Sequence, residues 1–122
     1  MNKYMAANLE NRLIEFASLA LTVCDCLKYT EIGKHLRSQL IRSATSVALN
    51  FGEARSAESP KDLHHKLSII LKELRESFIN LKLIKMNGLC KNASILDKTL
   101  DENNQLIAIF VKSIQTVRRK MK

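Results

Sequence analysis

Apolar residues recur at alternating spacings of four and three along four long segments of this chain. No other feature of the sequence constrains its fold as strongly. The first of these stripes consists of Leu9, Leu13, Phe16, Ala20, Val23 and Leu27. Such spacing places the apolar side chains along one side of an α-helix. Each of the four segments is therefore predicted to be a helix that buries one face.

The breaks between the stripes carry signals for the ends of helices. Ser59 is suited to cap a helix, and Pro60 suits the first helical position, where its missing N–H costs nothing. Gly88 is placed to adopt the left-handed conformation that ends a helix. The predicted helices span residues 5–28, 33–57, 60–87 and 92–122.

The scarcity of chain breakers favours long helices over a sheet. The chain has 122 residues, with three glycines and one proline, too few for the many tight turns of a β-fold. A chain of this length favours one domain with one core. Short connections between long helices predict an all-α fold, an antiparallel up-down-up-down four-helix bundle over residues 1–122.

The motifs of common enzymes and metal sites are missing from the sequence. It contains no Gly-rich phosphate loop, no Ser/His/Asp set and no Glu-x-x-His motif of a di-iron bundle. His64 and His65 are adjacent, so on a helix they diverge by about 100° and cannot grip one metal together. We therefore expect no enzyme activity, no metal and no cofactor.

The cysteines and the N-terminus indicate a cytoplasmic location. Cys24, Cys26 and Cys90 make an odd count in a chain without a signal peptide, which predicts reduced thiols. Cys24 is expected in or near the core and Cys26 nearer the surface. No stretch approaches the roughly 20 apolar residues that a membrane span needs, so no membrane partner is expected.

A basic cluster at the C-terminus is the strongest functional signal. Lys and Arg number 20 against 12 acids, which gives a net charge of +8 and favours polyanions as partners. An antiparallel bundle places the end of the fourth helix beside the start of the third. The candidate nucleic-acid-binding residues are Lys61, Lys66, Arg118, Arg119, Lys120 and Lys122. The alternative is a solvated helix end without a ligand.

The third segment carries a second apolar face. Ile79, Leu83 and Met86 lie opposite its main stripe, where a monomeric bundle has little use for apolar side chains. This pattern predicts homo-oligomerisation. The alternative is that loops or the N-terminal arm cover these residues.

The second segment carries a polar stripe that leads to a family resemblance. Gln39, Arg42, Ser43, Ala44, Ser46, Val47, Asn50 and Glu53 match the pattern of a bacterial four-helix-bundle family linked to intervening sequences in 23S rRNA genes. Ser59-Pro-Lys-Asp and Lys72-Glu-Leu-Arg-Glu76 extend the match. The chain departs from the pattern at Gly52, Ala54 and Leu63.

The resemblance implies a left-handed up-down bundle that assembles into a homopentameric ring. The family is similar to the pentameric accessory protein of diversity-generating retroelements, which binds nucleic acid and a reverse transcriptase through a basic surface. By this resemblance, the polar stripe is interpreted as a structural or subunit-interface network, to which the second apolar face adds Ile79 and Leu83. The network residues are Gln39, Arg42, Ser46, Asn50 and Glu53.

Two functional hypotheses follow. The first is a cytoplasmic, non-enzymatic homo-oligomer that binds structured RNA or DNA by phosphate contact, with little reading of bases. The alternative is a ring-shaped protein-interaction scaffold whose positive charge serves an acidic protein partner.

Overall fold

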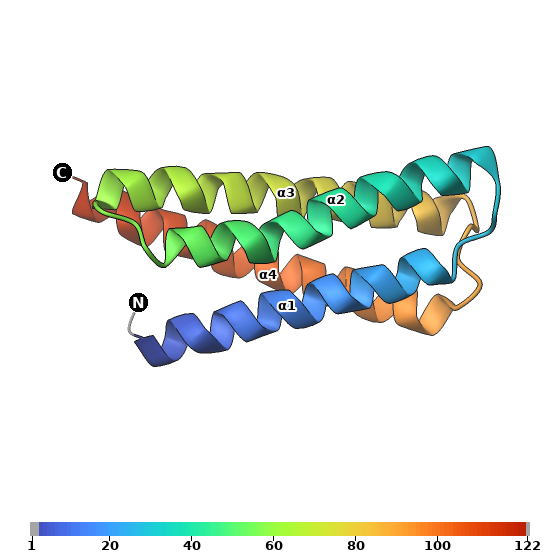
Figure 1. Cartoon of the computed structure of the whole chain (residues 1–122), viewed down its shortest axis with the longest axis horizontal. Coiled ribbons are helices and arrows are strands. Elements are labelled where there is room, and N and C mark those ends of the chain that lie inside the picture. Colours follow the sequence, from blue (N-terminus) through green and yellow to red (C-terminus); the bar gives the residue numbers. More distant parts are fainter. Residues whose placement is uncertain (1–2, 122) are drawn as a thin grey trace.

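Four long α-helices make up the computed structural model, which describes residues 3–121 (Figure 1). They are α1 (Lys3–Asp25), α2 (Glu31–Ala54), α3 (Pro60–Met86) and α4 (Ala93–Lys120). Successive helices run in opposite directions, and no strand occurs within the described residues. The predicted antiparallel four-helix bundle is therefore confirmed.

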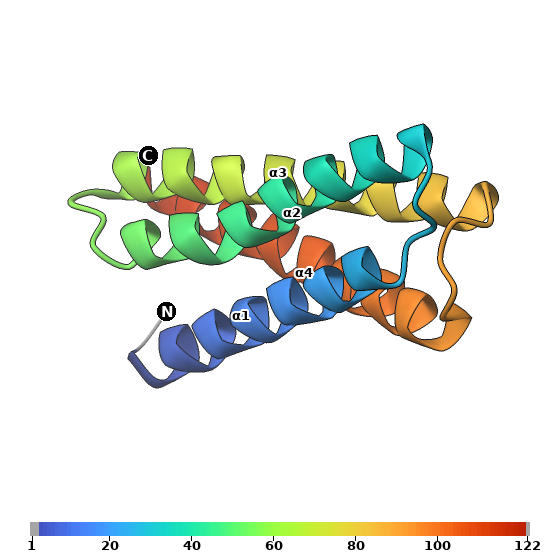
Figure 2. The same ribbon diagram turned by 45° about the vertical axis from the view of Figure 1, so that its right-hand side comes forward.

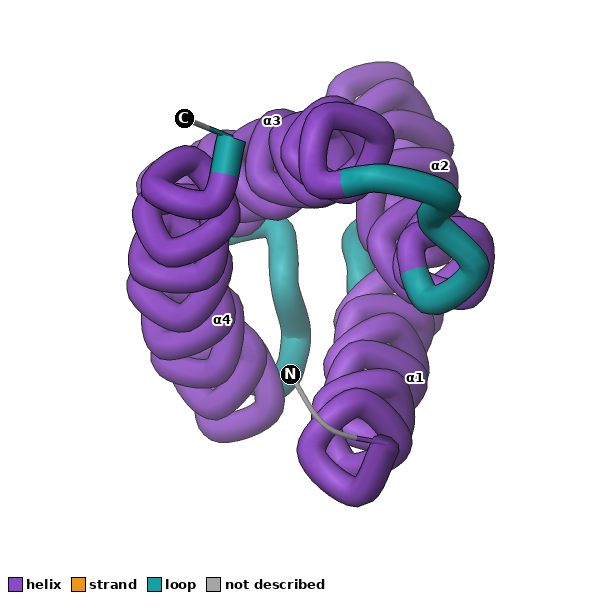
Figure 3. Tube along the Cα trace, turned by 90° about the vertical axis from the view of Figure 1, so that its left-hand side faces the viewer, coloured by secondary structure: helices purple, strands orange, loops and turns teal. Residues whose placement is uncertain are grey.

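Each helix packs against the next one along the chain, and α1 closes the bundle against α4 (Figure 3). Consequently α1 and α3 lie diagonally opposite each other, as do α2 and α4. The α1–α4 seam is the least extensive of the four, and the N-terminal half of α1 diverges from the bundle (Figure 2).

The two ends of α3 are fixed by the residues that the sequence pattern indicated, whereas α1 and α2 each end three residues earlier than predicted. The Ser59 hydroxyl accepts a hydrogen bond from the backbone N–H of Asp62 at 3.0 Å, and Pro60 opens α3. Gly88 follows α3 with a φ of 61°, the left-handed conformation predicted for it. At the same end of the bundle, the backbone N–H of Lys28 donates to the Leu89 carbonyl at 2.8 Å and ties the two loops together.

The core is built from the apolar stripes of all four helices. Phe16, Phe51 and Phe110 are almost wholly buried, and the rings of Phe51 and Phe110 meet edge to face with centroids 6.0 Å apart. Cys24 is buried as expected. The stripes thus converge on one continuous core that draws on every helix.

A few polar side chains are buried within this core. The hydroxyl of Ser77 on α3 donates to that of Ser43 on α2 at 2.9 Å, and the small size of the two serines allows these helices to approach closely. Asn103 on α4 is fully buried, and its Nδ2 donates to the Leu74 carbonyl on α3 at 3.0 Å. Its Oδ1 is buried without a partner among the described residues.

Because a buried acceptor without a donor is costly, Asn103→Leu should stabilise the protein. We expect the free energy of unfolding to rise by about 1 kcal/mol, as the lost hydrogen bond is offset by removal of the unpaired oxygen. Urea denaturation followed by circular dichroism measures this change. The matched control is Asn104→Leu at an exposed neighbouring position, which should change stability by less than about 0.5 kcal/mol. A destabilised Asn103→Leu protein would contradict the argument.

Candidate nucleic-acid interface

The antiparallel packing brings the end of α4 beside the start of α3. Nη2 of Arg118 lies 3.3 Å from Nε2 of His64. A guanidinium can only donate, so a hydrogen bond in this contact has the imidazole nitrogen as its acceptor. The contact unites the two segments whose cations were expected to form one patch.

Three of the candidate cations at this end are free of ion pairs. Lys61, Arg119 and Lys120 are exposed, and within residues 3–121 none of them has a carboxylate partner. With Arg118 they form a group that we call the basic end. Lys122 lies outside the described residues.

Lys66 lies close to the basic end, but its charge is already compensated. Its ammonium is 2.9 Å from the Asp62 carboxylate, which also accepts the backbone N–H of Glu58 at 3.2 Å. The hydrogen bond from Lys66, followed by the one from the Glu58 N–H, holds the pKa of Asp62 below its usual range. Lys66 is thus less available to a ligand than Lys61.

Arg55, at the end of α2, is drawn away from the basic end. Its guanidinium pairs with Glu10 on α1 at 2.9 Å. The basic end therefore depends on the termini of α3 and α4 alone. Arg118, Arg119 and Lys120 lie in the last turn of α4, where positive charge interacts favourably with the helix dipole.

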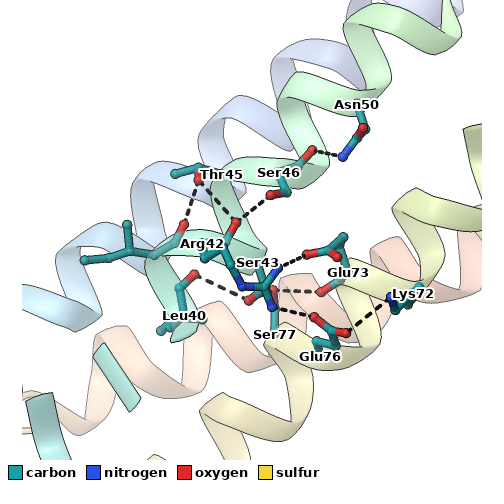
Figure 4. A network of polar contacts seen from close by, with 11 residues as sticks. Leu40, Arg42, Ser43, Thr45, Ser46, Asn50, Lys72, Glu73, Glu76 and Ser77 are labelled. Atoms are coloured by element: carbon teal, nitrogen blue, oxygen red, sulfur yellow. Dashed lines mark hydrogen bonds and ion pairs between the residues drawn. The ribbon is translucent and has the colours of Figure 1, made fainter. Parts of the chain in front are cut away.

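The polar stripe of α2 forms fewer contacts between helices than its pattern suggested (Figure 4). Only Arg42 crosses to α3, where it reaches Glu73 at 3.1 Å and Glu76 at 2.7 Å. The Ser46 hydroxyl and the Asn50 amide instead donate to backbone carbonyls of α2 itself.

The other two members of the polar stripe are Glu53 and Gln39. Glu53 is exposed, and no ion pair of its carboxylate is found in the described part of the chain. Glu53 therefore links α2 to no neighbouring helix by an ion pair in this part of the chain. Gln39 lines an open groove beside Arg42.

This groove runs along the outer side of α3 and is closed on one side by α2; we call it the α2–α3 groove. Its lining combines apolar, polar and charged side chains, and three of its four charged residues are basic: Gln39, Arg42, Ser68, Leu71, Lys72, Arg75, Glu76, Ile79 and Asn80.

The second apolar face of α3 continues from the groove toward the end of the helix. Ile79, Leu83 and Met86 are 55%, 40% and 82% exposed. No described loop covers them, so the alternative that other parts of the chain bury this face is wrong for residues 3–121. An exposed apolar stripe that extends a groove is typical of a protein interface.

Several residues that position these surfaces were not recognised in the sequence. Arg12 on α1 forms a bidentate pair with Glu102 on α4 at 2.8 and 2.9 Å, and also donates to Gln105. The Ser43–Ser77 contact was likewise missed. The sequence signal for an ion pair between helices is the presence of opposite charges on their neighbouring edges. This signal does not specify which charges meet.

Other kinds of site find no support in residues 3–121. No group of three or more His, Cys, Asp or Glu side chains is placed to hold a metal ion. Cys24, Cys26 and Cys90 are free thiols, and burial raises the pKa of Cys24 to about 11, which disfavours the reactive thiolate. In the same range, no helix combines the length and apolar character needed to cross a bilayer.

Comparison with known proteins gives a family and a structural relative. The model of the family described as "23S rRNA-intervening sequence protein" matches residues 12–112. Among solved structures, the chain resembles a Bacteroides thetaiotaomicron protein with unknown function from the S23 ribosomal protein family. The two share 25% sequence identity with a TM-score of 0.71, over 86% of this chain and 96% of the other. A search of curated proteins gave no significant match.

The lowered pKa of Asp62 predicts a pH-dependent contribution to stability. A carboxyl with a lower pKa in the folded state stabilises the protein above the ordinary Asp value of about 4. That contribution is lost as the pH falls through the folded-state pKa. We expect Asp62→Asn to lower the free energy of unfolding at neutral pH, and the difference from wild type to shrink toward zero in acid. Urea denaturation across this pH range measures the difference.

Lys66→Met provides the matched background for this experiment. Without the ammonium, Asp62→Asn should cost less stability at neutral pH than it does in the wild-type chain. A difference between wild type and Asp62→Asn that stays constant with pH would show that the ion pair does not stabilise the start of α3.

Proposed function

Since this chain belongs to the family of 23S rRNA-intervening sequence proteins, we propose that it is a non-enzymatic homo-oligomer that binds structured RNA or DNA. The basic end provides the contact surface, and phosphate groups are its ligands. The family description favours RNA of ribosomal origin as the first ligand to test.

The observation that carries this proposal is a set of uncompensated cations contributed by two helices. The end of α4 presents Arg118, Arg119 and Lys120, and the start of α3 presents Lys61. From Lys112 to the end of the chain there is no acid. At the opposite end of the bundle, Asp25, Glu31 and Asp97 pair with Arg37, Lys34 and Lys85. At the basic end, four cations without a carboxylate partner among the described residues are available to attract a phosphate backbone.

The mode of binding is phosphate contact with little reading of bases. Stacking needs exposed aromatic rings, but Phe16, Phe51 and Phe110 are buried in the core. Tyr29 is exposed at the opposite end, where the Lys34 ammonium lies 4.2 Å from its ring centroid, and Tyr4 is exposed near the start of α1. The basic end itself contains no aromatic residue, and phosphate contacts by Arg and Lys carry little sequence information.

Oligomerisation strengthens such binding. The exposed stripe of Ile79, Leu83 and Met86 provides apolar surface for a subunit contact. We extend the proposal to a cytoplasmic pentameric ring, the assembly that the sequence resemblance implies. Several basic ends on one assembly raise the effective affinity for a long polyanion without any new contact.

Replacing Arg118, Arg119 and Lys120 together with Gln should weaken binding and reduce its dependence on salt. Loss of three phosphate contacts lowers the slope of log affinity against log salt by about 2 to 3, and affinity at moderate salt by about tenfold or more. Fluorescence anisotropy of labelled hairpin RNA and duplex DNA, from about 50 to 300 mM salt, measures both quantities.

The matched control replaces Lys28, Lys91 and Lys98 with Gln, which removes the same total charge from the opposite end of the bundle. This variant should retain most of the affinity and of the salt slope. Equal losses in both variants would show that only net charge matters. Absence of binding by the wild-type protein at the lowest salt would overturn the nucleic-acid proposal and favour a scaffold for an acidic protein.

A further inference from the structure

The helix α1 differs in charge from the rest of this basic chain. It carries two cations and three carboxylates, whereas each of the other helices has more cations than carboxylates. Its Arg12 is engaged with Glu102 on α4. Glu10 and Asp25 pair with Arg55 and Arg37 of the α2 segment, so among the described residues Glu15 is the carboxylate that α1 presents without a cation.

Exposed apolar side chains lie near Glu15 on α1. Ile14 and Leu21, two helical turns apart, are 49% and 40% exposed, and Glu15 is exposed beside Ile14. Within residues 3–121, Glu15 has no cationic partner. Ile41 of α2 is also exposed and lies one turn from Arg37, which reaches Asp25 on α1. We call Ile14, Glu15, Leu21 and Ile41 the α1 face.

The α2–α3 groove has the complementary character. Its apolar lining residues are Leu71 and Ile79, and its basic side chains include Lys72 and Arg75. Arg75 is exposed and has no carboxylate partner in the described chain, whereas Lys72 pairs with Glu76 at 4.0 Å and Arg42 with Glu73 and Glu76. A groove that presents apolar side chains beside an unpaired arginine fits an amphipathic helix that carries a carboxylate.

We propose that the α2–α3 groove of one subunit receives the α1 face of a second copy of this chain. Glu15 then lies beside Arg75 and Lys72, while Ile14 and Leu21 cover Leu71 and Ile79. This inference rests on the proposed function, because it specifies the contact by which the homo-oligomer forms. It adds α1 as the partner for the apolar face of α3.

The arrangement of the helices permits every subunit to use both surfaces at once. α1 and α3 lie diagonally opposite in the bundle (Figure 3), so the two surfaces face different directions. Contact between two different surfaces is heterologous, and its repetition closes into a ring when the rotation between subunits allows it. The basic end belongs to neither surface and stays available to a polyanion.

A charge reversal and its rescue test this contact. In the full-length chain, Glu15→Arg and Arg75→Glu are each expected to raise the protein concentration at half assembly by tenfold or more. Both place like charges opposite each other, and the double variant restores attraction and returns assembly toward the wild-type concentration. Sedimentation velocity and light scattering measure assembly, and circular dichroism confirms folding.

The matched controls are Glu58→Arg and Lys98→Glu, which reverse exposed charges outside both surfaces and should leave assembly unchanged. Should a reversed variant fail to fold, Glu15→Gln and Arg75→Gln provide the same comparison with a smaller effect. An assembled wild type that neither single variant weakens overturns this contact but leaves oligomerisation intact. A folded double variant that stays dissociated also overturns this contact and leaves oligomerisation intact. A wild-type chain that is monomeric at every concentration overturns the oligomeric part of the proposed function itself.

Discussion

The requirement that each helix bury its apolar stripe is the constraint on which the rest of this structure depends. The four stripes can share one core only if every helix turns its stripe inward. Once the stripes face inward, the rotation of each helix is fixed, and so is the identity of every side chain that faces outward. The basic end, the α2–α3 groove and the α1 face are all consequences of that rotation.

The seams between helices decide which charges remain available. Every seam carries an ion pair: Arg55–Glu10, Arg42 with Glu73 and Glu76, Lys85–Asp97, and Arg12–Glu102. Exposed ion pairs contribute little to stability, typically about 0 to 1 kcal/mol each. Their larger effect here is on the distribution of charge, because they occupy arginines and lysines that would otherwise attract a ligand.

The two proposals use the charges and apolar groups left over from folding. Cations without carboxylate partners gather at the start of α3 and the end of α4, where a polyanion is attracted. Within the described chain, Arg75 remains unpaired in the α2–α3 groove, where a carboxylate from another subunit fits. The exposed isoleucines and leucines on α1 and α3 have no role inside the bundle, since the core is complete without them. Separate surfaces for assembly and for ligand binding allow both to operate in one molecule.

The sequence by itself determined the four helices, their antiparallel order, the capped start of α3 at Ser59 and Pro60, and the second apolar face of α3. These features depend on local spacing, capping and short loops, which act between residues close in the chain. Only the tertiary structure decided that Lys66 is held by Asp62, that Arg55 turns to Glu10, that Ser46 and Asn50 bond within α2, and that Asn103 donates to the Leu74 carbonyl. Those outcomes depend on which of several nearby side chains meets which in space, and helical periodicity places a residue on a face without choosing its partner.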